Sequence, residues 1–251
     1  SKKIGLAVFA SDALSSTAYA TQESMIILAA AGMAALSFVF PISIVIVLLL
    51  GIVTVSYVQV IHTYPSGGGG YIVSRDNLGE GAAMVAGAAL LIGYVLTVSV
   101  SIASAVAQIV SAFPQWFPYR ALISVAFILV MMVVNLRGVR ESGAIFAIPS
   151  YYFLLLMSLM VATGVFRYLT GSLSVVHDPP EMYETTLQPL SLFLILRAFS
   201  SGTTAMTGVE AISNGVTAFK EPRGRNASIT LVWMSAILSV LFVGISFLAV
   251  Q

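Results

Sequence analysis

Long apolar stretches without charge recur along the whole chain. A helix needs about 20 apolar residues to cross the hydrocarbon core of a bilayer, and no residue between Glu23 and Arg75 is charged. That interval is too long for one helix, and Ser37 and Pro41 mark a break within it. We therefore predict seven membrane-spanning helices: one that ends near residue 31, residues 38–62, a stretch from Glu80 to the turn at 113–118, and residues 121–136, 143–168, 188–219 and 226–251.

The composition agrees with this pattern. Hydrophobic residues make up 59% of the 251 residues and charged residues 8%, against about a quarter charged residues in soluble domains, so a water-soluble globule is excluded. The net charge of +1 gives no polycationic surface, which excludes nucleic-acid partners. The absence of cysteine excludes thiol chemistry, and two well-separated histidines, His62 and His177, cannot form a histidine-rich metal site alone. We expect no cofactor.

The Lys and Arg residues orient the seven predicted spans. Asp12 interrupts the apolar run that follows Lys2 and Lys3, so we interpret the N-terminal segment as a retained helix and not as a signal peptide. Basic residues favour the cytoplasmic side of short loops, and the loop at 171–187 is acidic and expected outside. We predict a multi-pass protein of the cell (inner) membrane whose N terminus is cytoplasmic. Eight basic residues are then inside, namely Lys2, Lys3, Arg75, Arg137, Arg140, Lys220, Arg223 and Arg225, and three are outside or near the outer ends, namely Arg120, Arg167 and Arg197.

Four charged residues lie within or near predicted spans: Asp12, Glu23, Arg197 and Glu210. A charge at mid-membrane costs about 2.5–3.5 kcal/mol on insertion scales, so it persists mainly where it faces a polar pathway. For Glu23 and Arg197, pairing with another charge or a position near the membrane interface is as good an explanation as a role in a polar pathway. Asp12 has unusual surroundings, which favour a role in a site.

Two predicted spans hold dense clusters of hydroxyl residues. Residues 9–21 read FASDALSSTAYAT, and residues 199–210 read FSSGTTAMTGVE. Ser, Asp and Thr side chains compete with the backbone hydrogen bonds of a helix, so we expect span one to be broken near 11–16 and span six near 200–208. Interrupted helices in corresponding positions are typical of a transporter built from inverted five-helix repeats, with its site at the midplane. Residues 1–170 would then form the first repeat, 171–187 an extracellular loop, and 188–251 the start of the second repeat.

A polar stripe follows one face of the third span. Tyr94, Thr97, Ser101, Ser104 and Gln108 recur at intervals of 3, 4, 3 and 4, which places them on one helical face. Packing between helices is an alternative explanation, since hydroxyl and small residues commonly hold membrane helices together. A similar face in span one would carry Asp12, Ser15, Ser16, Tyr19 and Glu23, and in span six Thr207, Glu210 and Asn214.

Oxygen ligands without thiol or imidazole suit a hard cation. An amino-acid carrier instead needs free backbone N–H groups for the substrate carboxylate, and Asp12 would repel that carboxylate in a low-dielectric cavity. Glu210 is a second acid within a span. Acids in such positions are the usual groups of intramembrane proton relays. We therefore expect Glu210 to carry the proton, and Asp12 to take part in proton coupling as well.

The loop at 65–71, PSGGGGY, lacks the Lys-Ser/Thr and the preceding strand of a phosphate-binding loop. We interpret it as a flexible, close-packed cytoplasmic turn.

These residues resemble a known family. The stretch from Phe9 to Ala20, the glycine loop, NLRGVRESG at 135–143 and EPRGRN at 221–226 are similar to the amino acid–polyamine–organocation (APC) superfamily. Within it, the first stretch resembles the KimA-type potassium importers, which are potassium/proton symporters. The resemblance implies an all-α LeuT-like 5+5 inverted-repeat fold. It also implies a potassium site made by Asp12, Tyr19, Tyr94, Thr97, Ser101 and Thr207, with Glu210 beside them.

The same resemblance implies partners beyond the bilayer, potassium and protons. In that family a cytosolic C-terminal region supports homodimerisation and regulation by cyclic di-AMP, and a further ligand lies in a later helix. We expect this chain to be a fragment that holds seven of ten core helices.

Three other functions stay open at this point. An amino-acid or organic-amine permease of the same superfamily is the main alternative, and a passive cation channel would use the same oxygen ligands without proton dependence. An intramembrane hydrolase using Asp12 and Glu210 is disfavoured, because the sequence has no Gly-flanked acid pair and no His-Glu-x-x-His spacing.

Overall fold

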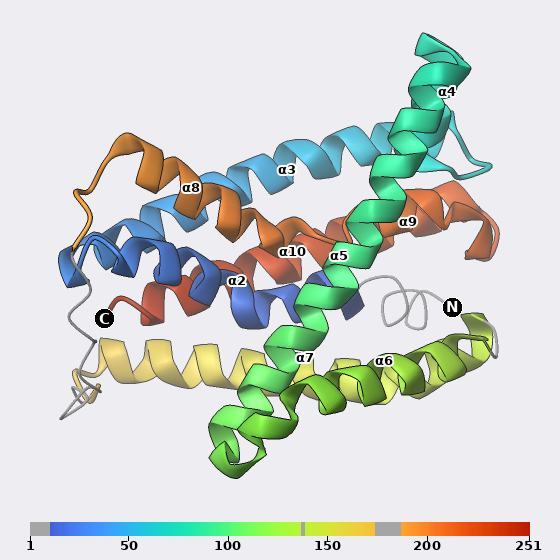
Figure 1. The fold of residues 1–251 in the computed structure, drawn as a ribbon. Helices are drawn as coiled ribbons and strands as arrows, with labels where there is room; N and C mark the ends of the chain where they lie inside the picture. Colours follow the sequence, from blue (N-terminus) through green and yellow to red (C-terminus); the bar gives the residue numbers. More distant parts are fainter. Residues whose placement is uncertain (1–10, 137–138, 174–186) are drawn as a thin grey trace. The chain divides into compact units, whose positions relative to one another are not determined.

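The computed structural model describes residues 11–136, 139–173 and 187–251, and within these ranges all regular structure is helical. Figure 1 follows the helices along the chain by colour. They are α2 (Ser11–Ala29), η1 (Met33–Phe38), α3 (Val39–Thr63), α4 (Gly69–Leu78), α5 (Glu80–Ala112), η2 (Pro114–Tyr119), α6 (Arg120–Leu136), α7 (Val139–Leu169), α8 (Leu192–Gly202), η3 (Thr203–Met206), α9 (Ala211–Asn214), η4 (Val216–Ala218) and α10 (Arg223–Leu248).

Six helical stretches of the described residues are long and apolar enough to cross a membrane: Met33–Thr63, Glu80–Ala112, Pro114–Leu136, Ala147–Leu169, Leu192–Asn214 and Arg223–Leu248. They coincide with the second to seventh predicted spans. The first predicted span corresponds to α2, which has 19 residues, including Asp12 and Glu23. Residues 1–10, with Lys2 and Lys3, lie outside the described residues, so a seventh crossing stays a prediction. The same holds for most of the predicted outer loop, at 174–186.

The chain divides into two compact units. Among the described residues, unit 1 comprises Tyr57–Pro149 and Glu210–Thr230, and unit 2 comprises Asp12–Ser56, Ser150–Val209 and Leu231–Gln251. Unit 2 has a hydrophobic core built by α2, η1, α3, α8, η3 and α10. Its buried members are Ala20, Leu28, Ala35, Val39, Ile42, Ile46, Ala198, Ala205 and Phe242.

Hydroxyl groups and a glycine hold the helices of unit 2 close together. The Ser24 hydroxyl of α2 donates to the carbonyl oxygen of Ala198 in α8 (3.0 Å), and a Cβ at Gly202 would overlap that same hydroxyl oxygen. Thr21 of α2 and Ser246 of α10 share a hydrogen bond of 2.9 Å between their hydroxyl oxygens. Small and hydroxyl residues commonly stabilise helix pairs in membranes in this way.

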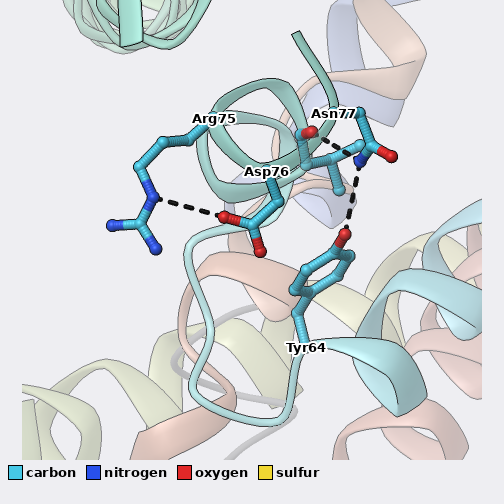
Figure 2. A network of polar contacts seen from close by, with 5 residues as sticks. Tyr64, Arg75, Asp76 and Asn77 are labelled. Atoms are coloured by element: carbon cyan, nitrogen blue, oxygen red, sulfur yellow. Dashed lines mark hydrogen bonds and ion pairs between the residues drawn. The ribbon is translucent and has the colours of Figure 1, made fainter. Parts of the chain in front are cut away.

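In unit 1, α4 packs against α5 and α5 against α6. Figure 2 shows how the start of this unit is held: the Asn77 amide of α4 donates to the Tyr64 hydroxyl (3.3 Å) and to the carbonyl oxygen of Val73 (2.8 Å). Arg75 and Asp76 form an exposed ion pair beside them, with 3.3 Å between Nε and Oδ1. The turn predicted at 65–71 is shorter in the structure, because α4 begins at Gly69.

The sequence predicts a break near residues 11–16, but in the structure these residues are α-helical, because α2 begins at Ser11. The physical reason lies in the hydroxyl groups. Ser15 and Ser16 donate to the Asp12 carbonyl oxygen (2.8 and 3.1 Å), and Thr17 donates to that of Leu14 (2.7 Å). These side chains bond to carbonyls one turn back, which a helix tolerates, instead of opening the backbone.

Span six is interrupted. The α-helix that begins at Leu192 ends at Gly202, a 3-10 turn follows at Thr203–Met206, and helical structure resumes only at Ala211. Thr207 has an extended backbone, and Gly208 has a φ of +79°, which favours glycine. This interruption overlaps the interval 200–208 that the hydroxyls and glycines indicated.

Candidate functional site

Three hydroxyl oxygens meet in unit 2. The Ser16 Oγ lies 3.1 Å from the Tyr19 hydroxyl and 2.7 Å from the Thr207 Oγ1. Ser16 and Tyr19 come from adjacent turns of α2, and Thr207 comes from the interrupted segment 191 residues later. Ser16 is fully buried and Tyr19 is buried. Two predicted ligands, Tyr19 and Thr207, are therefore joined through a residue that was not among the predicted ligands.

Asp12 lies against the interruption of span six. A Cβ at Gly208 would be 2.7 Å from the Asp12 Oδ2 and 2.9 Å from the backbone nitrogen of Ala13. The glycine thus lets the first turn of α2 approach the unwound backbone closely. Unit 2 therefore brings a carboxylate and three hydroxyl oxygens to the same two segments, the start of α2 and residues 207–208.

Glu210 belongs to unit 1 and has two donors there. The backbone N–H of Gly70 donates to its Oε1 (3.2 Å), and the Tyr57 hydroxyl of α3 donates to its carboxylate. Both donors come from segments far away in the sequence. The carboxylate is therefore held between the glycine loop and α3.

The polar stripe of α5 also lies in unit 1. The Tyr94 hydroxyl accepts a hydrogen bond of 2.5 Å from the Nδ2 of Asn214. Thr97 and Ser101 follow Tyr94 at helical spacing on α5, so the three residues share one face.

The predicted site residues thus fall into two groups. Asp12, Tyr19 and Thr207 belong to unit 2, and Tyr94, Thr97, Ser101 and Glu210 belong to unit 1. A common ion site that uses both groups stays a prediction.

Sequence reasoning did not select three residues that contact the predicted ones: Ser16, Tyr57 and Asn214. Ser16 and Asn214 had a signal, because they lie on the predicted polar faces of spans one and six. Tyr57 had none, since it belongs to no polar face that the sequence indicated.

The chemistry of both groups is that of oxygen. Carboxylates, hydroxyls and phenols are hard ligands, which suit alkali cations better than soft metals. At the start of α2, the carboxylate of Asp12 lies near the neutral hydroxyl oxygens of Ser16, Tyr19 and Thr207, a charge pattern that matches one monovalent cation.

The sequence matches the amino acid permease family over residues 6–250. The chain belongs to this family. The chain is also 46% identical to "Potassium transporter KimA" of Bacillus subtilis (strain 168). This alignment runs over 247 residues and covers 97% of the chain. The alignment covers 40% of that relative, so the chain spans well under half of its length.

Family membership agrees with the fold. The amino acid permease family belongs to the APC superfamily, whose members have a LeuT-like fold, and the interrupted sixth span is consistent with it. Together with the apolar helices, this makes the chain a multi-pass integral membrane protein that resembles KimA.

Proposed function

We propose that this protein is a secondary active transporter that imports potassium. The observation that carries the proposal is the 46% identity, over 97% of the chain, to a relative named as a potassium transporter. The site residues supply oxygen ligands, which suit potassium. This support is independent of the comparison, because the ligands were inferred from the residues alone. Potassium is the substrate of this proposal and not a resident cofactor.

Asp12 supplies the negative charge that compensates the bound cation. Tyr19 and Thr207 supply hydroxyl oxygens, and their contact with Ser16 limits how far each can turn. Tyr94, Thr97 and Ser101 are the ligands proposed from α5. A bound potassium ion needs several oxygens to replace its hydration shell, and this set provides neutral oxygens together with one carboxylate.

Glu210 is the proposed proton carrier, with Asp12 as a second acid. Its carboxylate accepts from the Gly70 N–H and from Tyr57. A protonated carboxyl group carries an O–H donor and has fewer acceptor sites than a carboxylate, so protonation would change these contacts. Glu210 would then change partners when it gains or loses a proton, which is what coupling requires.

Alternating access would come from rocking of spans one, two, six and seven against spans three, four and five. Hinges are a few loop or element-terminal residues that absorb large φ/ψ changes, and Gly208, whose φ is positive, lies at the break of span six. We place the N terminus and the glycine loop on the cytoplasmic side of the cell membrane, as the basic residues predict.

The decisive test is potassium-dependent growth of a strain without its own potassium uptake. The intact protein should restore growth at low potassium, and Asp12→Asn should not, because the site loses its charge. A matched control is Asp76→Asn, which removes an exposed carboxylate of α4 and should leave growth unchanged. Equal growth with Asn at residue 12 would contradict the proposed site.

An amino-acid or organic-amine permease is the second candidate, favoured by the description of the matched family. Thermal stability of the purified protein distinguishes the two functions. Potassium, and not sodium or amino acids, should raise the unfolding temperature, because a bound ligand stabilises the folded state. Stabilisation by an amino acid alone would favour the permease.

A passive channel differs in its energetics. Its potassium flux would not depend on pH at a fixed membrane potential, whereas proton-coupled import would increase with external acidity.

Homodimerisation and cyclic di-AMP regulation belong to the same proposal, and both rest on the family resemblance. Cross-linking of the intact protein in membranes, with and without the nucleotide, tests them.

A further inference from the structure

The glycine-rich loop between α3 and α4 is tied together at its base. Tyr64, the residue after α3, accepts a hydrogen bond from Asn77 of α4, and Asn77 also donates to the carbonyl of Val73 within α4 (Figure 2). The bond from Asn77 to Tyr64 therefore links α4 to the residue that precedes the loop at 65–68. The loop also lies close to another element of unit 1.

That other element is the segment after the break in span six. A Cβ at Gly67 would lie 2.7 Å from the carbonyl oxygen of Asn214, and a Cβ at Gly69 would overlap the side-chain oxygen Oδ1 of the same residue. Both glycines have positive φ angles, +80° and +44°, which residues with a Cβ rarely adopt. Glycine is thus required twice, and both times for the close approach to Asn214.

Only the nitrogen of the Asn214 side-chain amide has a hydrogen-bond partner among the described residues. Its Nδ2 donates to the Tyr94 hydroxyl at 2.5 Å, whereas its Oδ1 is buried and has no hydrogen-bond partner among the described residues. A buried acceptor without a partner destabilises the folded protein. Stability alone therefore does not favour asparagine here, and the bond to Tyr94 is the one that the amide makes.

We propose that Asn214 is a positioning residue for potassium binding, which acts by orienting the Tyr94 hydroxyl. The glycine loop clamps Asn214, and Asn214 in turn fixes the phenol oxygen on the polar face of α5. The hydrogen bond from Asn214 constrains the direction in which the phenol oxygen presents its lone-pair electrons. This inference rests on the proposed potassium transport and extends it to a residue that does not touch the ion.

A double-mutant cycle tests the proposal in the intact protein. Initial uptake rates against potassium concentration give the KM and the maximal rate for wild type, Asn214→Ala, Tyr94→Phe and the double variant. Losing one hydrogen bond corresponds to about a 5-fold rise in KM for Asn214→Ala. The double variant should have the KM of Tyr94→Phe, because both changes remove the same oriented hydroxyl.

Two controls separate positioning from general damage. Asn214→Gln keeps the amide and should recover part of the affinity, and the KM does not depend on how much protein reaches the membrane. Tyr119→Phe removes an exposed phenol at the end of η2 and should combine independently with Asn214→Ala. Independent, multiplicative effects of Asn214→Ala and Tyr94→Phe, or an unchanged KM in Asn214→Ala, overturn the positioning role while potassium transport stands. A wild-type protein that takes up no potassium overturns the proposed function as well.

Discussion

Gly208 and Asp12 lie against each other because residue 208 has no side chain. The position that a Cβ would take at residue 208 is 2.7 Å from the Asp12 Oδ2, and the backbone there has a φ of +79°. Both observations require glycine, one through space and the other through conformation. This contact joins the first turn of α2 to the interruption of span six.

Gly208→Ala should therefore destabilise the protein and abolish potassium-dependent growth. A left-handed backbone conformation in a residue with a Cβ costs about 1–3 kcal/mol, and the Asp12 carboxylate must also move. Thermal unfolding in detergent measures the first effect, and growth at low potassium measures the second. Gly51→Ala is the matched control, because a Cβ there meets nothing within 4 Å. Equal unfolding temperatures for the two variants would contradict the prediction.

Ser16→Ala should weaken potassium binding without preventing folding. The change removes the hydroxyl that joins Tyr19 to Thr207, so each of these two oxygens loses one of the contacts that orient it. One lost hydrogen bond is worth about 1 kcal/mol, which corresponds to about a 5-fold higher KM for potassium uptake. Ser37→Ala is the control, since its exposed hydroxyl bonds only to the Ala34 carbonyl among the described residues. An unchanged KM in Ser16→Ala would show that the bridge has no part in binding.

Glu210→Gln should remove the pH dependence of uptake. In the wild type, import should become faster as the external pH falls below the internal pH, because inward proton movement drives potassium inward. Glutamine cannot carry a proton in this way, although it can still accept from Gly70 and Tyr57. Fluorescent measurement of internal pH during potassium uptake by vesicles checks this. The control is Glu80→Gln, at the exposed start of α5, in which uptake should still depend on pH. Uptake by Glu210→Gln that still depended on pH would exclude Glu210 as the proton carrier.

Thr54 and Ser235 should be energetically coupled. Their hydroxyls share a 2.7 Å hydrogen bond between α3 and α10, and both residues are buried. Bonds of this kind between membrane helices average about 0.6 kcal/mol in double-mutant cycles, so Thr54→Val and Ser235→Ala should each destabilise the protein and together cost less than their sum. Unfolding in detergent measures the four proteins. Thr163→Val, at an exposed residue that bonds within its own helix, should show no coupling with Ser235→Ala.

The sequence predicted most of the helices because their signal is local. Charge-free apolar runs fixed α3, α5, α6, α7 and α10 to within a few residues, since the bilayer requires a minimum length of apolar helix. The interruption of span six was also visible, because glycine and hydroxyl residues weaken a helix wherever they cluster.

The conformation of residues 11–16 was not predictable in the same way. A serine or threonine hydroxyl can disrupt a helix or bond to a carbonyl one turn back, and the sequence is the same in both cases. The structure has the second arrangement, with Ser15 and Ser16 bonded to Asp12.

By itself, the sequence determined that this protein is a helical membrane protein with oxygen-rich, acid-bearing segments, and its motifs indicated the family. Only the tertiary structure decided which oxygens meet. Ser16 reaches Thr207 across 191 residues, and the glycine loop reaches Asn214 across more than 140. Such contacts depend on how closely two backbones approach, and that distance is set by packing between segments, which periodicity along one segment does not contain.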